Sequence, residues 1–213
     1  MANWCDTEYA FEGSKKDTEE LAKVMKGLLA KKRRGGKDSW KAKPEWLGYV
    51  AKDLLGEKSL DEEDCRGSFY ISKEEEPKKN GKAWVVRLSA STAWRNQNWL
   101  FKELADKFNL KLYWQSSEFN EDYWETNDTD GKYFSDRYYL ETCEDGCYYA
   151  TEKEVKKSIA IECGIKAKKN EDLKTYIDRV NAEEEVVLNI QTCEVVDDDS
   201  DDEDEGVEEF FKD

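Results

Sequence analysis

The sequence of 213 residues contains no histidine, only two prolines and no long apolar run. The absence of histidine excludes Ser-His-Asp and Cys-His nucleophiles, imidazole acid–base chemistry and zinc sites that need an imidazole ligand. No stretch approaches the roughly 18 apolar residues of a membrane helix, and residues 1–13 contain no apolar signal core. We therefore expect a cytoplasmic protein with no membrane segment.

Charged residues are abundant, at 39% of the chain, and their balance gives a net charge of −16. The 8 tryptophans, 11 tyrosines and 8 phenylalanines still supply enough apolar area for a core, and the length fits one domain with a tail. Residues 197–213 contain 11 acidic side chains and one lysine, so this segment carries most of the net charge. We expect one domain over residues 1–195 and a solvated acidic tail over residues 196–213.

Two patterns resemble metal sites but do not have the necessary ligands. Cys143 and Cys147 form the only close pair among six cysteines, and a single pair with a three-residue spacer indicates a hairpin turn rather than a metal site. Residues 127–131 look like part of a calcium loop, but Thr126 and Arg137 would then occupy its first and last ligand positions, and neither offers a carboxylate. A polar hairpin turn is the better interpretation, and we expect no metal or cofactor.

Hydrophobic periodicity predicts a mixed α+β fold. Alternation over residues 4–12 predicts a half-buried strand with Asp6, Glu8 and Glu12 pointing outward. Residues 17–30 predict a helix that ends in basic residues and stops at Gly35-Gly36. The following predictions are a short helix over 44–55, a strand over 69–71, a tight turn at Asn80-Gly81, a strand over 83–90, a helix after Asn96 and a strand over 110–115. This order matches the ferredoxin-like split β-α-β motif, in which two helices cover one face of an antiparallel sheet.

Extra strands and helices follow this motif. Residues 116–150 predict aromatic strands and turns. The sequence Thr151-Glu-Lys-Glu154 is a capping box that opens a helix through Ile159. A second helix around Ile177 and a last strand over residues 186–190 complete the expected domain.

Several short motifs resemble the YubB-type ferredoxin-like family of phages and conjugative plasmids. The motifs, which together cover residues 1–150 with gaps, are Asn3-Trp4-Cys5, Phe11-Glu12-Gly13, Ser91-Thr92-Ala93-Trp94, Leu104-Ala105-Asp106-Lys107-Phe108 and Gly131-Lys132-Tyr133-Phe134. The sequence departs from that family at Arg95-Asn96-Gln97, where Ser-Pro-Pro is usual, and in its acidic tail. The resemblance implies a ferredoxin-like fold and a phage or mobile-element protein in the bacterial host cytoplasm. It implies no catalytic residues.

The acidic tail is the first candidate functional segment. Its candidate protein-binding residues are Asp197, Asp198, Asp199, Asp201, Asp202, Glu203, Asp204, Glu205, Phe210 and Phe211. An acidic run that ends in aromatic residues resembles the tails of single-stranded-DNA-binding proteins, which compete with nucleic acid for the protein's own groove and anchor partners. Closely spaced carboxylates can also fill a basic channel on another protein. A tail that only keeps the protein in solution is the third interpretation.

One dense basic cluster is the second candidate, and its members are Lys31, Lys32, Arg33, Arg34 and Lys37. These residues can contact phosphates or the chain's own tail. A basic helix end that is stabilised by the helix dipole is the structural alternative, and we favour it. A P-loop is excluded because Asp38, rather than serine or threonine, follows Lys37.

The sequence therefore favours binding over catalysis. Nine aromatic residues between positions 119 and 149 either fill a core or form a protein-binding surface. Outward carboxylates on the first strand disfavour the stacking of RNA bases there. We hypothesise a non-catalytic phage or mobile-element accessory protein. It would bind a protein partner with a basic surface, as an inhibitor or modulator of a host nucleic-acid-handling or defence factor. The alternatives are a single-stranded nucleic-acid-binding protein with an autoinhibitory, partner-recruiting tail and, third, an enzyme that uses carboxylates or a cysteine.

Overall fold

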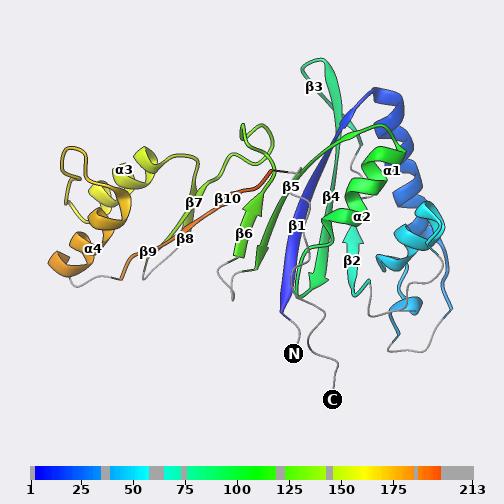
Figure 1. The fold of residues 1–213 in the computed structure, drawn as a ribbon, viewed down its shortest axis with the longest axis horizontal. Coiled ribbons are helices and arrows are strands. Elements are labelled where there is room, and N and C mark those ends of the chain that lie inside the picture. Colours follow the sequence, from blue (N-terminus) through cyan, green and yellow to red (C-terminus); the bar gives the residue numbers. More distant parts are fainter. Residues whose placement is uncertain are drawn as a thin grey trace.

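The computed structural model describes residues 3–34, 39–57, 65–72, 76–118, 123–142, 146–184 and 187–197. Two sheets, one large and one small, each carry helices (Figure 1). The elements are β1 (Trp4–Gly13), α1 (Lys15–Ala30), a 3-10 turn (Trp40–Ala42), a π-helix (Val50–Leu55), β2 (Gly67–Tyr70), β3 (Lys78–Asn80), β4 (Ala83–Ala93), α2 (Asn98–Lys107), β5 (Lys111–Glu118), β6 (Tyr123–Thr126), β7 (Tyr138–Glu141), β8 (Gly146–Tyr149), α3 (Glu152–Glu162), α4 (Leu173–Glu184), β9 (Asn189–Thr192) and β10 (Glu194–Val195). The chain is therefore a mixed α+β protein with mostly antiparallel sheets, as predicted.

The larger sheet, the main sheet, has the strand order β10-β6-β5-β1-β4-β2, and β3 pairs with β4. All of its neighbouring strands are antiparallel except β10 and β6. The alternation predicted for β1 is confirmed. The side chains of Tyr9 and Phe11 are buried on one face, whereas those of Asp6 and Glu8 are exposed on the other. The predicted turn at Asn80-Gly81 is also confirmed, since it joins β3 to β4.

Both α1 and α2 pack on the face of the main sheet that carries Tyr9 and Phe11. This main core includes Leu21, Met25 and Leu28 from α1 and Leu100, Phe101 and Leu104 from α2. The Phe101 ring stacks on Tyr9 with its centroid 4.0 Å away. On the opposite face, Phe134 lies in a smaller cluster with Ala10, Val85 and Tyr113. The segment after β6 therefore covers part of the face opposite the helices.

Residues 138–192 form an inserted unit, because the chain leaves the main sheet after β6 and returns to it at β10. The inserted unit has its own sheet, β8-β7-β9, which lies with α3 and α4 at the left of Figure 1. Its core is separate from the main core and consists of Leu140, Val155, Ile159, Leu173, Tyr176, Ile177, Val180 and Leu188. The predicted capping box is confirmed, since Thr151 and Glu154 bond reciprocally at the start of α3. The range expected as one domain thus contains two sheets, and the inserted unit has a core of its own.

Two local predictions are wrong. Helix α1 ends at Ala30, and Lys31 is its cap with extended backbone, so the basic cluster follows the helix instead of forming its last turn. Residues 127–131 do not form a hairpin turn, because β6 and β7 belong to different sheets. The buried Asp128 organises this loop instead. Its carboxylate accepts hydrogen bonds from the backbone N–H groups of Lys132, Tyr133 and Phe134 at 2.6 to 3.0 Å.

A third prediction is correct at its end but not at its start. The helix expected over residues 44–55 begins only at Val50 and ends as predicted at Gly56, whose φ is +88°. The start is delayed because Trp46 forms a β-bridge with Ser68. In the part of the chain that the structure describes, none of the helices has the length and apolar character needed to cross a membrane.

Candidate binding groove

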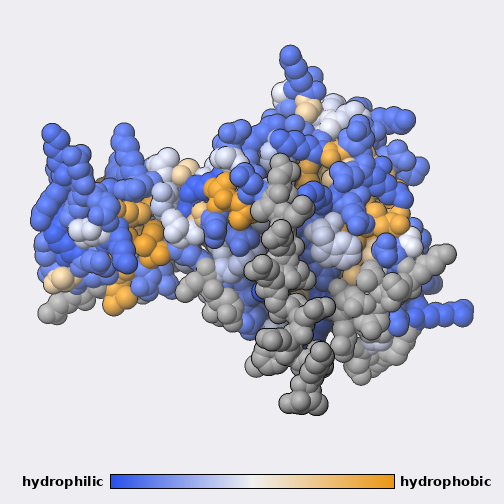
Figure 2. Space-filling model, viewed as in Figure 1, coloured by the Kyte–Doolittle hydropathy of each residue, from blue (hydrophilic) through white to orange (hydrophobic). Residues whose placement is uncertain are grey.

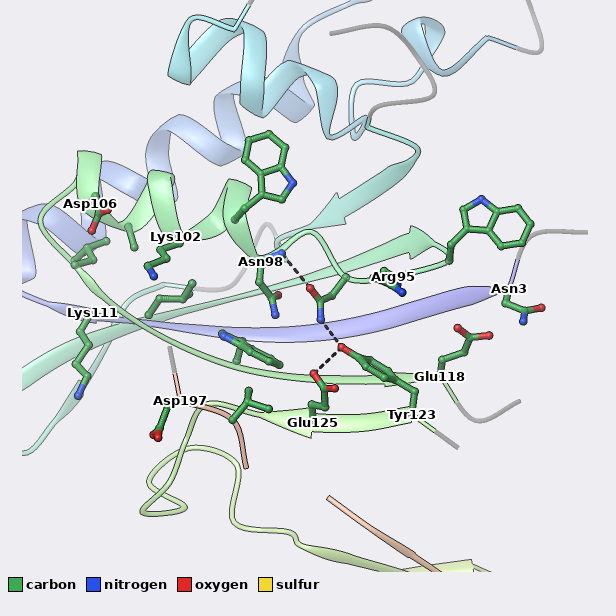
Figure 3. A pocket seen from close by; sticks show the side chains of 18 of the residues that line it. Asn3, Arg95, Asn98, Lys102, Asp106, Lys111, Glu118, Tyr123, Glu125 and Asp197 are labelled. Carbon is green, nitrogen blue, oxygen red and sulfur yellow. Dashed lines mark hydrogen bonds between the residues drawn. The ribbon is translucent and has the colours of Figure 1, made fainter. Parts of the chain in front are cut away.

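A groove of about 1420 Å³ lies beside α2 on the helix-bearing face of the main sheet. Helices α1 and α2 pack against β1, β4 and β5, but the sheet continues beyond α2 to β6 and β10. Side chains of α2 form one wall, β5 and β6 form the floor, and Asp197 lies on the far side (Figure 3). Val196 also lines the groove. The groove is therefore the space above the part of the sheet that α2 does not cover.

The turn between β4 and α2 presents a tryptophan at the groove in a strained backbone conformation. Trp94 has a φ of +76°, and the N–H of Arg95 donates to the carbonyl of Ala93 at 3.0 Å, so the turn closes over one residue. Such a γ-turn is rare and strained for a bulky L-residue. The turn is held by a hydrogen bond from Trp94 N to Asn3 O at 2.8 Å and by one from the Thr92 hydroxyl to Arg95 O at 2.7 Å. As a result, 59% of the Trp94 surface is exposed.

A chain of hydrogen bonds fixes the middle of the groove. Asn96 Nδ2 donates to the Tyr123 hydroxyl, which donates to Glu125 Oε2 at 2.9 Å (Figure 3). Beside this chain, the buried hydroxyl of Tyr9 donates to Asn98 Oδ1 at 2.9 Å. Burial raises the pKa of both tyrosines, and the Glu125 carboxylate adds to the rise at Tyr123. Both hydroxyls therefore remain protonated donors that hold the groove in shape.

Glu118 lines the groove at the end of β5, and its carboxylate is buried. Only 4% of the residue is exposed, and its Oε1 atom has no hydrogen-bond partner in the described chain. None of the ion pairs between described residues includes it. Nearby, burial raises the pKa of the Cys5 thiol to about 11, and the charge of the Glu118 carboxylate adds to the rise. A hydrogen bond to Thr7 lowers this pKa but is outweighed. Cys5 therefore stays a neutral thiol and offers no nucleophile.

The two ends of the groove differ in charge. Lys111 and Glu118 are the first and last residues of β5, so about 23 Å of strand separates them. Lys102 and Asp106 of α2 lie toward the Lys111 end, whereas Tyr123 lies at the Glu118 end as its cross-strand partner (Figure 3). The groove thus offers lysines at one end and a buried carboxylate at the other.

The acidic tail begins at the groove. Asp197 is exposed and lines its far side, and Val196 N donates to Thr126 O at 2.9 Å, which fixes the point where the tail leaves the sheet. The other predicted tail residues lie outside the described residues: Asp198, Asp199, Asp201, Asp202, Glu203, Asp204, Glu205, Phe210 and Phe211.

The described members of the predicted basic cluster do not line the groove, and two of them pair within the chain. Lys31 Nζ and Arg33 Nη2 each lie 3.0 Å from Asp53 Oδ2. Desolvation raises the pKa of Asp53, but the hydrogen bonds from these two cations outweigh it and lower the pKa. The Arg33 guanidinium also lies 3.4 Å from the centre of the Tyr49 ring. Lys32 and Arg34 are exposed, and Lys37 lies outside the described residues.

The aromatic segment after residue 119 divides between burial and exposure. Trp124 and Phe134 are buried, whereas Tyr148 is exposed and its ring meets Trp124 edge-on at 5.7 Å. This contact joins the inserted unit to β6.

The close cysteine pair lies at the predicted hairpin, since β7 and β8 pair antiparallel. Cys147 is exposed in β8, and Cys143 lies outside the described residues. Within the described ranges, no three cysteine or carboxylate side chains are placed to hold a metal ion.

Apart from Asp197, the groove residues were not predicted from the sequence, although one signal was present. The alternation of β5 continues beyond Gln115 and places Ser116 and Glu118 on the same face as the buried Trp114. An acidic residue on the inward face of a strand indicates a polar site. Trp94, which is 59% exposed, has no comparable signal because its exposure depends on the backbone conformation of the turn.

Comparisons with known proteins give no relative from which to read the groove's function. No protein-family model, no curated protein and no solved structure matches the chain. On the side of the molecule shown in Figure 2, hydrophilic residues dominate and hydrophobic residues form small separate patches. Function must therefore be argued from the groove itself.

Proposed function

We propose that this chain is a non-catalytic binding protein that takes a segment of a basic protein partner into the groove beside α2. The observation that carries the proposal is the pair of exposed tryptophans, Trp94 and Trp99, at a groove that contains a buried carboxylate. Tryptophan is enriched among the residues that dominate binding energy at protein interfaces. The strained turn supports this further, because strain at an exposed aromatic residue persists where its position serves binding.

We also propose that the main sheet is a ferredoxin-like fold. Its central strands have the order β5-β1-β4-β2, and α1 and α2 follow β1 and β4, which supports this assignment. The resemblance to the YubB-type family, the phage setting and the action on a host defence factor remain predictions from the sequence.

Selection from a random-peptide display library tests the proposed function. Peptides selected on the full chain should bind a variant with Trp94→Ala and Trp99→Ala at least about 30-fold more weakly, the loss typical of hot-spot residues. Tyr70→Ala is the matched control, because Tyr70 is 53% exposed on β2, outside the groove. Equal binding by the double variant, or selection of no peptide, would contradict the proposal.

A second candidate function is binding of single-stranded nucleic acid. It is favoured by Lys102 and Lys111 in the groove and by the tail that starts there at Asp197. Fluorescence anisotropy at low salt would compare the full chain with a chain that ends at Val196. Salt-sensitive DNA binding by the shorter chain alone would support an autoinhibited DNA-binding protein, and no binding by either chain would leave the protein-binding function in first place.

A further inference from the structure

We propose that the Glu118 end of the groove binds an arginine side chain of the partner, and this inference rests on the proposed function. The guanidinium would pair with the Glu118 carboxylate beside Tyr123 and Trp94. Glu118 is 4% exposed, lines the groove and has a carboxylate oxygen without a partner in the described chain. A buried carboxylate oxygen without a donor is costly, and a charged donor from outside removes that cost.

Two other places in the molecule show the same arrangement with an arginine already present. Arg33 pairs with Asp53 at 3.0 Å while its guanidinium lies 3.4 Å from the centre of the Tyr49 ring. A tyrosine and a carboxylate thus hold one guanidinium between them.

The second example lies in the inserted unit. Arg179 donates two hydrogen bonds to Glu171, each 2.9 Å long, and lies 5.4 Å from the centre of the Tyr176 ring. Glu118 and Tyr123, which are cross-strand neighbours, also place a carboxylate beside a tyrosine, but here no arginine of the described chain is bound. The guanidinium that completes this site therefore comes from the partner.

The chemistry of the pocket favours guanidinium over other cations. A guanidinium donates in a planar fork that matches a carboxylate, and it stacks on aromatic faces, whereas an ammonium group is more strongly hydrated. A metal ion does not fit, because no three ligating side chains of the described residues come together. Arg95 lines the groove on the turn but forms no ion pair with Glu118, so the chain's own arginine leaves the carboxylate open.

The test uses three peptides that differ at one position. Acetyl-Ser-Gly-Arg-Gly-Ser-amide, its lysine analogue and its citrulline analogue are each titrated into the ¹⁵N-labelled full chain up to roughly 10 mM, where weak single-residue contacts are detectable. We expect the arginine peptide to bind at least about tenfold more tightly than the neutral citrulline peptide, with the lysine peptide between them.

Matched variants separate this site from the acidic tail, which attracts any cationic peptide. Glu118→Gln should abolish the preference for arginine over citrulline and leave thermal stability unchanged or higher, because it removes an unpaired charge. Glu103→Gln changes the net charge equally on the exposed surface of α2 and should keep the preference. Equal binding of arginine and citrulline peptides, or an unchanged preference in Glu118→Gln, would overturn the inference.

Two further outcomes identify what failed. If arginine dependence appears only after Arg95→Gln, Arg95 itself occupies the site and the inference is wrong. If display-selected peptides depend on Trp94 and Trp99 but contain no arginine, the proposed function holds and the arginine inference alone is wrong.

Discussion

The main sheet and the inserted unit differ in the size of their cores and in the roles that their polar side chains play. In the inserted unit, polar groups hold a small core together. Glu171 accepts two hydrogen bonds from Arg179, and the Asn181 amide pairs with the backbone of Leu188 at 2.8 and 3.0 Å. In the main sheet, a much larger apolar core leaves room for polar residues that do not stabilise the fold, among them the buried Glu118.

Backbone strain also differs between the main sheet and the inserted unit. The inserted unit has one described non-glycine residue at positive φ, Asn170, and asparagine tolerates that conformation. In the part of the chain that carries the main sheet, the described residues with positive φ are Asn109 and Trp94. Trp94 lies beside the groove, and tryptophan tolerates a positive φ less readily than asparagine. The comparison indicates that the main sheet has the stability to support a strained, charged groove, whereas the inserted unit is built mainly to hold itself together.

The largest expected effect is the loss of an aromatic ring from the main core. Phe101→Ala should destabilise the chain by about 3–5 kcal/mol, because Phe101 is fully buried and stacks on Tyr9. Hydrogen exchange should show reduced protection across β1, β4 and β5. Ile159→Ala, in the separate core of the inserted unit, should reduce protection in α3 and α4 but leave the main sheet unchanged. Equal losses in both regions after either substitution would break the distinction between the two cores.

Relief of strain at the groove should have a smaller effect of opposite sign. Trp94→Gly should raise the free energy of unfolding by up to about 1 kcal/mol, because glycine adopts a φ of +76° without steric cost. Selected peptides should nevertheless bind this variant much more weakly. Asn170→Gly in the inserted unit is the control, with little change in either property. A clear loss of stability in Trp94→Gly, measured by denaturant unfolding, would show that the ring supports the fold instead of binding.

The pH dependence of stability sharpens the role of the ion pair in the inserted unit. Hydrogen bonds from Arg179 hold the pKa of Glu171 at about 2, below its ordinary value of 4.5. Because the pKa of Glu171 is lower in the folded state, its ionised carboxylate stabilises the fold at any pH above the unfolded-state pKa. This stabilisation disappears as the pH falls toward 2. Glu171→Gln should therefore melt below wild type at pH 7, and the difference should shrink below pH 4.5 and close near pH 2. A difference that stays constant with pH would contradict this role.

Cysteine reactivity gives a comparison that leaves the fold intact. Cys147 of the inserted unit is exposed, whereas Cys5 of the main sheet is buried and its pKa is raised to about 11. Iodoacetamide should modify Cys147 of the native protein first, because the thiolate is the reactive form. Peptide mapping by mass spectrometry resolves the positions, and Cys147→Ser provides the control. Equal rates at Cys5 and Cys147 would mean that Cys5 is as accessible as an exposed thiol, which would contradict its burial in the main sheet.

Local features of the fold were predictable from sequence, and long-range ones were not. The alternation of β1, the capping box at Thr151 and the turn at Gly81 each depend on a few neighbouring residues, and all three were predicted. The separate sheet of the inserted unit depends on the pairing of Glu141 with Asn189, far apart in the sequence, and no local pattern indicates it.

The groove escaped prediction for two physical reasons. Glu118 lies on the inward face only if the alternation of β5 continues past Gln115, where the apolar residues stop. Trp94 adopts a backbone conformation that its residue type disfavours, so propensity points away from the observed turn.

The most direct test of the account is to locate the partner's contact on the full chain. A display-selected peptide would be titrated into protein labelled with ¹⁵N only at tryptophan, with each indole N–H signal followed by NMR. The account predicts that the signals of Trp94 and Trp99 shift, whereas those of Trp84, at the far end of β4, and Trp124, beside the inserted unit, stay in place. A shift at Trp124 with none at Trp94 or Trp99 would place binding at the inserted unit and contradict the account.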